Sequence, residues 1–137
     1  MQLTKKLISL AALCAALTVC SGVANAEMTE AGKKAMKAAG KIMFEQRCES
    51  CHADDPERKA YGPSLLGVVG RKAGSLEGFD YSDAMKKSGI TWNLDTLRAW
   101  MADNQDFLPG TRMRHVSIHD KAEQDFLLAY INSLSKK

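Results

Sequence analysis

The most reactive side chains of this 137-residue chain lie together in the run Cys48-Glu49-Ser50-Cys51-His52. Two residues between the cysteines place both sulfurs about one helical turn apart, on one face of the backbone. That spacing suits thioether bonds to the two vinyl groups along one side of a porphyrin, and the adjoining histidine can then bind the iron. C-x-x-C-H is the attachment signal of c-type haem. The motif therefore predicts one covalently bound haem c.

Zinc is the main chemical alternative, because C-x-x-C pairs also occur in zinc sites and in thioredoxin-like redox sites. His115 and His119 have H-x-x-x-H spacing and could complete a Cys₂His₂ site with the cysteine pair on paper. The long separation between the two pairs argues against that site. It would also leave His52 without a role, so the sequence favours haem.

The first 26 residues have the organisation of a secretory signal peptide. Two lysines are followed by an apolar run from Leu7 to Val19, which is too short to span a bilayer comfortably, and by the small-x-small site Ala24-Asn25-Ala26. We expect cleavage before Glu27 and export to the periplasm. Residues 27–137 would then form one domain without a transmembrane anchor. An uncleaved membrane anchor is the alternative.

Cleavage there removes Cys14 and Cys20, so no cysteine remains beyond the haem pair and no disulfide framework is possible. Lipid attachment at Cys20 is disfavoured because Val19 stands where such sites need a small residue. Cleavage also removes two of the 19 basic residues and none of the 16 acidic residues. The mature chain is then nearly neutral, without a nucleic-acid-binding footprint. We expect a monomer.

The periodicity of the mature chain predicts an all-α domain of four to five helices around the haem. Thr29 can cap a helix from about residue 30 to 48, and either Thr91 or Asn93 can cap a helix ending near residue 104. A short helix is expected over 82–87, and a last helix over about 120–135. Five glycines between residues 61 and 80 predict a loop that wraps closely around a flat ligand.

The second iron ligand must come from Met85, Met101, Met113, His115 or His119. Met101 falls on an apolar helical face, and Met85 falls on a short helix, so packing is the simpler role for both. Met113 instead follows Pro109-Gly110 in an extended loop, far along the chain from His52. A loop can bring one side chain across a haem face while its backbone stays outside. The residues alone leave the choice between Met113 and a histidine open.

A series of short motifs, in order over residues 40–134, resembles class I cytochrome c of the mitochondrial-type branch and its bacterial relatives. This resemblance implies that Met113 is the second axial ligand, and that the Pro63 carbonyl accepts a hydrogen bond from His52. The matching segments are Tyr61-Gly62-Pro63-Ser64-Leu65, Gly70-Arg71-Lys72-Ala73-Gly74, Tyr81-Ser82-Asp83-Ala84, Gly89-Ile90-Thr91-Trp92, Pro109-Gly110-Thr111-Arg112-Met113 and Leu128-Ala129-Tyr130.

The resemblance also implies contacts to the haem propionates. Tyr81, Trp92 and Thr111 would donate hydrogen bonds to them, and Arg71 would offset their charge, because buried propionates need donors and a cation. Without the resemblance, the two aromatic residues would be interpreted as ordinary core. The family further implies that Gly40 on the first helix lets the last helix approach closely.

Several positions depart from the family pattern. His115 and Ser117 replace a typical aromatic residue and a typical glycine after the ligand, and Met85 stands where the family often has asparagine. Residues Gln105, Asp106, His119 and Asp120 stand where relatives often carry lysine. Arg47, Lys72 and Arg112 remain as candidate members of a basic ring around the haem edge, so long-range steering of partners should be weak.

Together these features predict a non-enzymatic, soluble electron carrier that passes single electrons between larger redox proteins. The alternatives are a haem peroxidase or a small-ligand-binding protein with a labile Met113, and a relay subunit tied to one redox enzyme.

Overall fold

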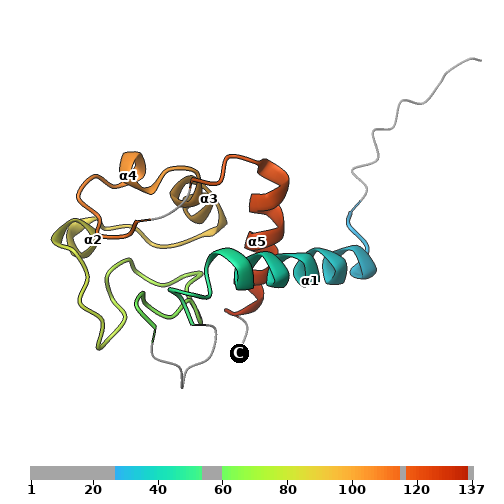
Figure 1. Ribbon diagram of the computed structural model, residues 1–137, viewed down its shortest axis with the longest axis horizontal. Helices are drawn as coiled ribbons and strands as arrows, with labels where there is room; N and C mark the ends of the chain where they lie inside the picture. Colours follow the sequence, from blue (N-terminus) through green and yellow to red (C-terminus); the bar gives the residue numbers. More distant parts are fainter. Residues whose placement is uncertain (1–26, 54–59, 115–116, 136–137) are drawn as a thin grey trace, which may run out of the picture.

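The computed structural model describes residues 27–53, 60–114 and 117–135 (Figure 1). The signal-peptide prediction and His115 fall outside these ranges. No strand occurs within them; an isolated antiparallel bridge joins Lys72 to Thr91. The predicted all-α class is confirmed. The helices are α1 (Glu30–Arg47), α2 (Asp83–Lys87), α3 (Leu94–Ala102), α4 (Asn104–Phe107) and α5 (Lys121–Ser133).

Side-chain caps explain where the longer helices begin. The Thr29 hydroxyl accepts a hydrogen bond from Gly32 N at the start of α1, and Asp120 accepts one from Glu123 N at the start of α5. At α3 the structure selects Asn93 over Thr91. Asn93 Oδ1 accepts from Thr96 N, and Thr96 Oγ1 accepts from Asn93 N, both at 2.8 Å. This reciprocal capping box satisfies backbone groups that a helix start would otherwise leave unpaired.

The helix expected to continue to residue 104 ends at Ala102, and α4 is a separate turn. Asp103 divides them because its backbone is extended, with φ −157° and ψ 102°. Its carboxylate accepts hydrogen bonds from Gln105 N and Asp106 N, both at 3.0 Å. Aspartate competes for backbone donors in this way, so it favours a helix start over a helix interior. The break changes the direction of the chain just before the Met113 loop.

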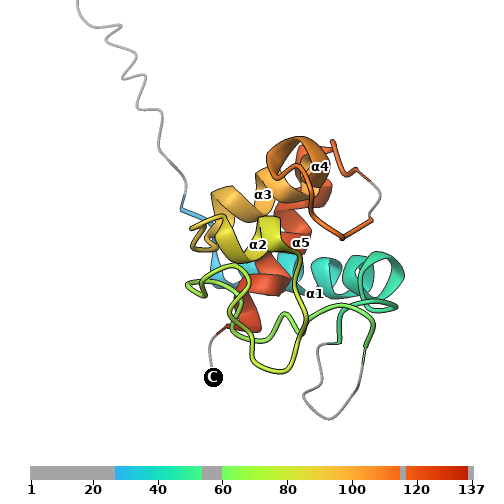
Figure 2. The same ribbon diagram turned by 90° about the vertical axis from the view of Figure 1, so that its left-hand side faces the viewer.

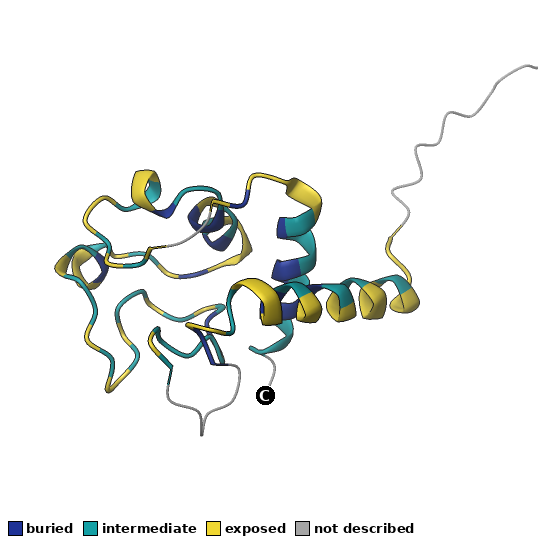
Figure 3. Ribbon diagram, in the orientation of Figure 1, coloured by how far each residue is buried: buried dark blue, intermediate teal, exposed yellow. Residues whose placement is uncertain are grey.

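The largest helix contact in the described chain is the crossing of α1 and α5 (Figure 1). A Cβ placed on Gly40 would lie 1.9 Å from the Phe126 carbonyl oxygen, so only glycine allows this approach. Beside it the rings of Phe44 and Tyr130 pack with centroids 5.3 Å apart. The buried sides of the two helices face one another in Figure 3. This crossing holds the end of α1, where the cysteine pair begins.

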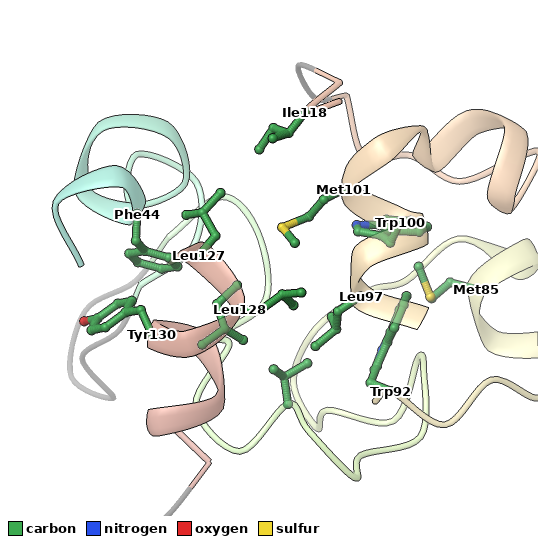
Figure 4. Close-up of a cluster of buried hydrophobic side chains, with 12 residues drawn as sticks. Phe44, Met85, Trp92, Leu97, Trp100, Met101, Ile118, Leu127, Leu128 and Tyr130 are labelled. Carbon is green, nitrogen blue, oxygen red and sulfur yellow. The ribbon is translucent and has the colours of Figure 1, made fainter. Parts of the chain in front are cut away.

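A second group of buried side chains lies on and around α3 (Figure 4). Trp100 packs against Trp92 and Phe107, with ring centroids 5.4 and 6.2 Å away, and these two rings also contact one another. Met85 and Met101 are each 7% exposed and belong to the same core, as their packing interpretation expects. Figure 2 shows the loop of residues 60–80 facing the layer of α3 and α4. None of the described helices is long and apolar enough to cross a membrane.

Candidate cofactor site

The cysteine pair lies where α1 ends. Cys48 is the C-cap residue of α1, and its backbone N–H donates to Phe44 O at 2.8 Å. Backbone bonds from Cys51 N and His52 N to Cys48 O, at 3.0 and 2.8 Å, continue the turn through the motif. Burial raises the pKa of the Cys48 thiol to about 11, whereas Cys51 is exposed. The motif therefore presents one thiol from the core edge and one from the surface, within one turn.

His52 is 8% exposed and has a fixed orientation. Its Nδ1 lies 2.8 Å from the Pro63 carbonyl oxygen. Because a carbonyl can only accept, Nδ1 carries the proton and Nε2 carries the lone pair that can bind a metal. A partner of this kind orients a ligating histidine and raises its basicity.

The backbone beside His52 explains the glycine that precedes Pro63. Gly62 N donates to Cys51 O at 2.6 Å, which draws this loop against the motif. A Cβ on Gly62 would lie 2.7 Å from His52 Cε1 and 2.9 Å from Cys51 O. The close approach of the loop thus requires glycine, and the approach in turn brings the Pro63 carbonyl to the ring.

Met113 is half-buried and packs against the core. Both its side-chain sulfur and its backbone carbonyl accept hydrogen bonds. The Trp100 indole N–H donates to Met113 Sδ, with 3.3 Å between nitrogen and sulfur. The side-chain amides of Asn104 and Gln105 donate to the Met113 carbonyl at 2.7 and 2.9 Å. One short stretch, from the end of α3 into α4, therefore provides all three donors.

The structure gives Arg71 and Tyr81 a shared environment. The Arg71 guanidinium donates to Ser64 O at 2.7 Å and to Leu66 O at 2.9 Å. Burial lowers its pKa, although arginine stays a cation at neutral pH. Burial also raises the pKa of Tyr81, and the nearby Arg71 charge opposes that rise. The structure thus places a half-buried cation and a half-buried phenol close enough for their charges to interact.

Trp92 is positioned by the backbone pairing around Arg71. Trp92 N donates to Arg71 O at 2.9 Å, and Gly70 N donates to Trp92 O at 2.7 Å. The Trp92 side chain is only 7% exposed, and its indole N–H donates no hydrogen bond to another described residue. A buried indole N–H normally has a partner. A carboxylate from a bound group would supply one here.

A cavity of about 850 Å³ opens beside the α4 turn, and Asp103, Asn104 and Gln105 contribute to its lining. Tyr61, adjacent to Gly62, lies on one side of it. Thr111, Arg112 and Arg114, which flank Met113, lie on the other. Its size is within the range of cofactor sites, about 300–1,000 Å³. His52 and Trp92 are not among its lining residues. The fit to a cofactor carrying iron and carboxylates rests instead on the His52 tautomer and on the buried Trp92 N–H.

The described residues include no cluster of three or more His, Cys, Asp and Glu side chains suited to a metal ion. The zinc alternative therefore has no support in this part of the chain; His119 is exposed, and His115 lies outside the described ranges.

Sequence reasoning did not identify Trp100, Asn104 and Gln105 as site residues. Trp100 carried the signal of an apolar helix face, which gives no information on where its N–H points. Gln105 was interpreted only as a surface position at which relatives often carry lysine. An amide pair directly after the helix-capping Asp103 is a pattern that could have drawn attention to this turn.

Comparison with known proteins agrees with this geometry. A profile of the family "Cytochrome c" matches residues 37–135. Cytochrome c2 of Rhodoplanes tepidamans is 42% identical over 95 residues, covering 69% of this chain and 88% of the relative. Cytochrome c type-1 of Ascaris suum is 38% identical over 99 residues, covering 72% and 88%.

A solved structure, cytochrome cH from Methylobacterium extorquens, superposes with a TM-score of 0.65 at 42% identity. The match covers 71% of this chain and 97% of that chain. The cysteine pair has the spacing that covalent attachment in this family requires. The chain is therefore a class I monohaem cytochrome c, with one haem c covalently attached and a role in electron transport.

Proposed function

We propose that this cytochrome c is a freely diffusing periplasmic electron carrier whose haem iron is held by His52 and Met113. The observation that carries the proposal is that both side chains have fixed contacts. The Pro63 carbonyl orients the His52 ring, and the Trp100 indole N–H donates to the Met113 sulfur. If these two residues hold the haem iron, no coordination site remains for a substrate, which suits electron transfer.

When bound, the haem supplies an iron that is reversibly reduced by one electron. This chain's own residues supply orientation, dielectric and protection. The Pro63 carbonyl holds the proton of His52 on Nδ1. The core around Trp92 and Trp100 keeps water from one side of the site. A thioether sulfur at the second position favours the ferrous state and raises the potential.

The propionate contacts belong to the same proposal. Trp92 has a buried N–H without a partner among the described residues, Tyr81 is a half-buried phenol, and Arg71 is a half-buried cation. We place the carboxylates of the haem near these three groups. Thr111 would contribute a hydroxyl from the Met113 loop, where its Oγ1 lies 3.4 Å from Met113 N.

Partner recognition should depend little on long-range charge. Arg112, which lines the cavity, donates one hydrogen bond to the Asp80 carboxylate at 3.2 Å and another to the Asp80 backbone carbonyl at 2.7 Å. Arg47, another member of the expected basic ring, contacts Glu123 at 2.5 Å. Paired charges produce a weaker external field than free ones. We therefore propose that the carrier is a monomer and that its redox protein partners have only modest electrostatic complementarity to its surface.

An optical spectrum of the exported protein, ferric and then ferrous, with and without carbon monoxide, tests this function. We expect a weak long-wavelength iron–sulfur band in the ferric form and no response to carbon monoxide in the ferrous form. A missing band with rapid carbon monoxide binding would contradict the carrier. It would point to peroxidase or small-ligand chemistry. Stable co-purification with one redox enzyme would instead identify a relay subunit.

A further inference from the structure

The carbonyl of Met113 accepts two side-chain amides from the same helical turn. Asn104 Nδ2 lies 2.7 Å from it and Gln105 Nε2 lies 2.9 Å from it. A carbonyl oxygen has two lone pairs, so both bonds can form at once. On the opposite side, the carbonyl of Cys51, the neighbour of His52, accepts from the backbone N–H of Gly62. The backbone carbonyl on the Met113 side is therefore held by side-chain donors, whereas the corresponding carbonyl on the His52 side is held by a backbone donor.

The turn that carries both amides is itself fixed. The Asp103 carboxylate caps α4 through Gln105 N and Asp106 N. Leu108 N closes the turn on Asn104 O at 3.1 Å. These bonds set the direction of the amides before they meet Met113. The contact is thus a feature of a pre-formed turn, in contrast to two flexible surface side chains meeting by chance.

The two amides differ in burial, which ranks their importance. Asn104 is 3% exposed, whereas Gln105 is exposed. If Met113 moved away, water could replace the carbonyl for Gln105 at small cost. Because Asn104 is buried, its bond to the carbonyl is better shielded from water than that of Gln105 and is more costly to break. Movement of Met113 is therefore resisted mainly by Asn104.

We propose that the amides of Asn104 and Gln105 form a clamp on the Met113 carbonyl, which sets how readily an external ligand displaces the Met113 sulfur from iron. The inference rests on the proposed ligand role of Met113. A ligand that takes the iron position displaces the Met113 sulfur, and a backbone held by the clamp gives the segment less freedom to accommodate that displacement. These two residues are positioning residues, since they act only through Met113.

The test is a titration of the ferric holoprotein with imidazole, following loss of the iron–sulfur band. Asn104→Leu keeps the size of the side chain and removes its donor; we expect it to raise the apparent imidazole affinity about tenfold. Gln105→Ala should raise it about threefold, since its amide is exposed. Because Gln105 lies at the surface, this variant remains informative if Asn104→Leu fails to mature.

Gln124→Met is the matched control. Gln124 is 5% exposed, and its Nε2 donates to Ile118 O at 2.6 Å, so it too is a buried amide on a backbone carbonyl near the same loop. We expect a loss of unfolding stability comparable to that of Asn104→Leu, with imidazole affinity changed by no more than about twofold. Equal affinity changes in both variants, in proportion to stability, would show a merely structural role and overturn the clamp.

The control also separates the clamp from the ligand assignment. If the wild-type ferric protein has the iron–sulfur band and Asn104→Leu leaves imidazole affinity unchanged, the clamp is wrong while the carrier function stands. If the wild-type protein lacks the band, Met113 is not the ligand, and both the ligation and the clamp are refuted.

Discussion

The two sides of the candidate site are built in different ways. On the His52 side, attachment points, ligand and orienting carbonyl all lie between residues 48 and 63, and backbone hydrogen bonds join them. On the Met113 side, the proposed ligand lies on a loop, and the groups that hold it are side chains of α3 and α4. The first side is a compact local unit, and the second is assembled by tertiary structure.

This difference has a physical consequence. On the His52 side, covalent attachment and the close approach of the loop at Gly62 leave little conformational freedom. On the Met113 side, the proposed ligand is held by a few hydrogen bonds of modest strength. A typical hydrogen bond contributes about 0.5–1.5 kcal/mol to stability. Ligand exchange, if it occurs, should therefore begin at Met113. The predictions below test each side, from the largest expected effect to the smallest.

The largest effect should come from removing both attachment points. Cys48→Ala combined with Cys51→Ala should abolish covalent haem, because both thiols of the attachment motif are then missing and no thioether can form there. Haem staining after denaturing electrophoresis measures this directly. Undiminished staining in the double variant would refute the attachment prediction for the His52 side.

Met113→Ala should affect only the opposite side. We expect the ferric iron–sulfur band to vanish and carbon monoxide to bind the ferrous protein, while the haem stays attached through the cysteine pair. Absorbance spectra and haem staining on the same sample separate the two sides. A variant that keeps the band would remove Met113 from the ligand role and would return attention to the histidines of its loop.

How far the sequence predicts this molecule follows from the same contrast. The all-α class and the Thr29 cap were predicted because they depend on short-range patterns. The break at Asp103 was missed because apolar periodicity continues past a residue that prefers to cap. A periodicity argument measures side-chain polarity, and it gives no weight to a competing backbone hydrogen bond.

The site shows the same limit. The Pro63 contact to His52 came from family resemblance, and its observed distance of 2.8 Å supports the proposed role. The contacts from Trp100, Asn104 and Gln105 to Met113 were not predicted. Their separations along the chain have no periodic signature, and they form only once α4 turns away from α3. These contacts depend on the direction that α4 takes relative to α3 in the tertiary structure, and local composition does not specify that direction.

A smaller effect is expected from Gly62→Ala, which disturbs the tight loop of the His52 side. The added Cβ would lie 2.7 Å from His52 Cε1 and 2.9 Å from a backbone oxygen, so the ring or the loop must shift. Overpacking of this kind costs about 1–3 kcal/mol. Urea unfolding of the holoprotein, followed by absorbance, measures the loss.

Gly32→Ala is the control for that variant. Its Cβ would lie 2.9 Å from the flexible Met28 side chain and at an ordinary contact distance of 3.4 Å from Thr29 Oγ1, in the first turn of α1. Because alanine favours a helix more than glycine does, stability should stay the same or rise by up to about 1 kcal/mol. Equal stability in the two variants would mean that the loop beside His52 is looser than its contacts indicate.

The smallest effect concerns the electronic state of the Met113 sulfur. The Trp100 N–H draws electron density from Met113 Sδ, which weakens donation to ferric iron and favours the ferrous state. Trp100→Phe keeps an aromatic ring and removes that donor. A hydrogen bond worth about 0.5–1 kcal/mol corresponds to a fall of roughly 20–40 mV for a one-electron couple. A redox titration of the holoprotein measures it.

Phe107→Leu distinguishes the hydrogen bond from packing. The Phe107 ring centroid lies 6.2 Å from that of Trp100, so this change loosens the same aromatic group without removing a donor to sulfur. We expect a change in stability but a smaller change in potential than for Trp100→Phe. Equal falls in potential for both variants would assign the effect to loosened packing. The Met113 side would then be tuned by the shape of the core, with the indole hydrogen bond making no separate contribution.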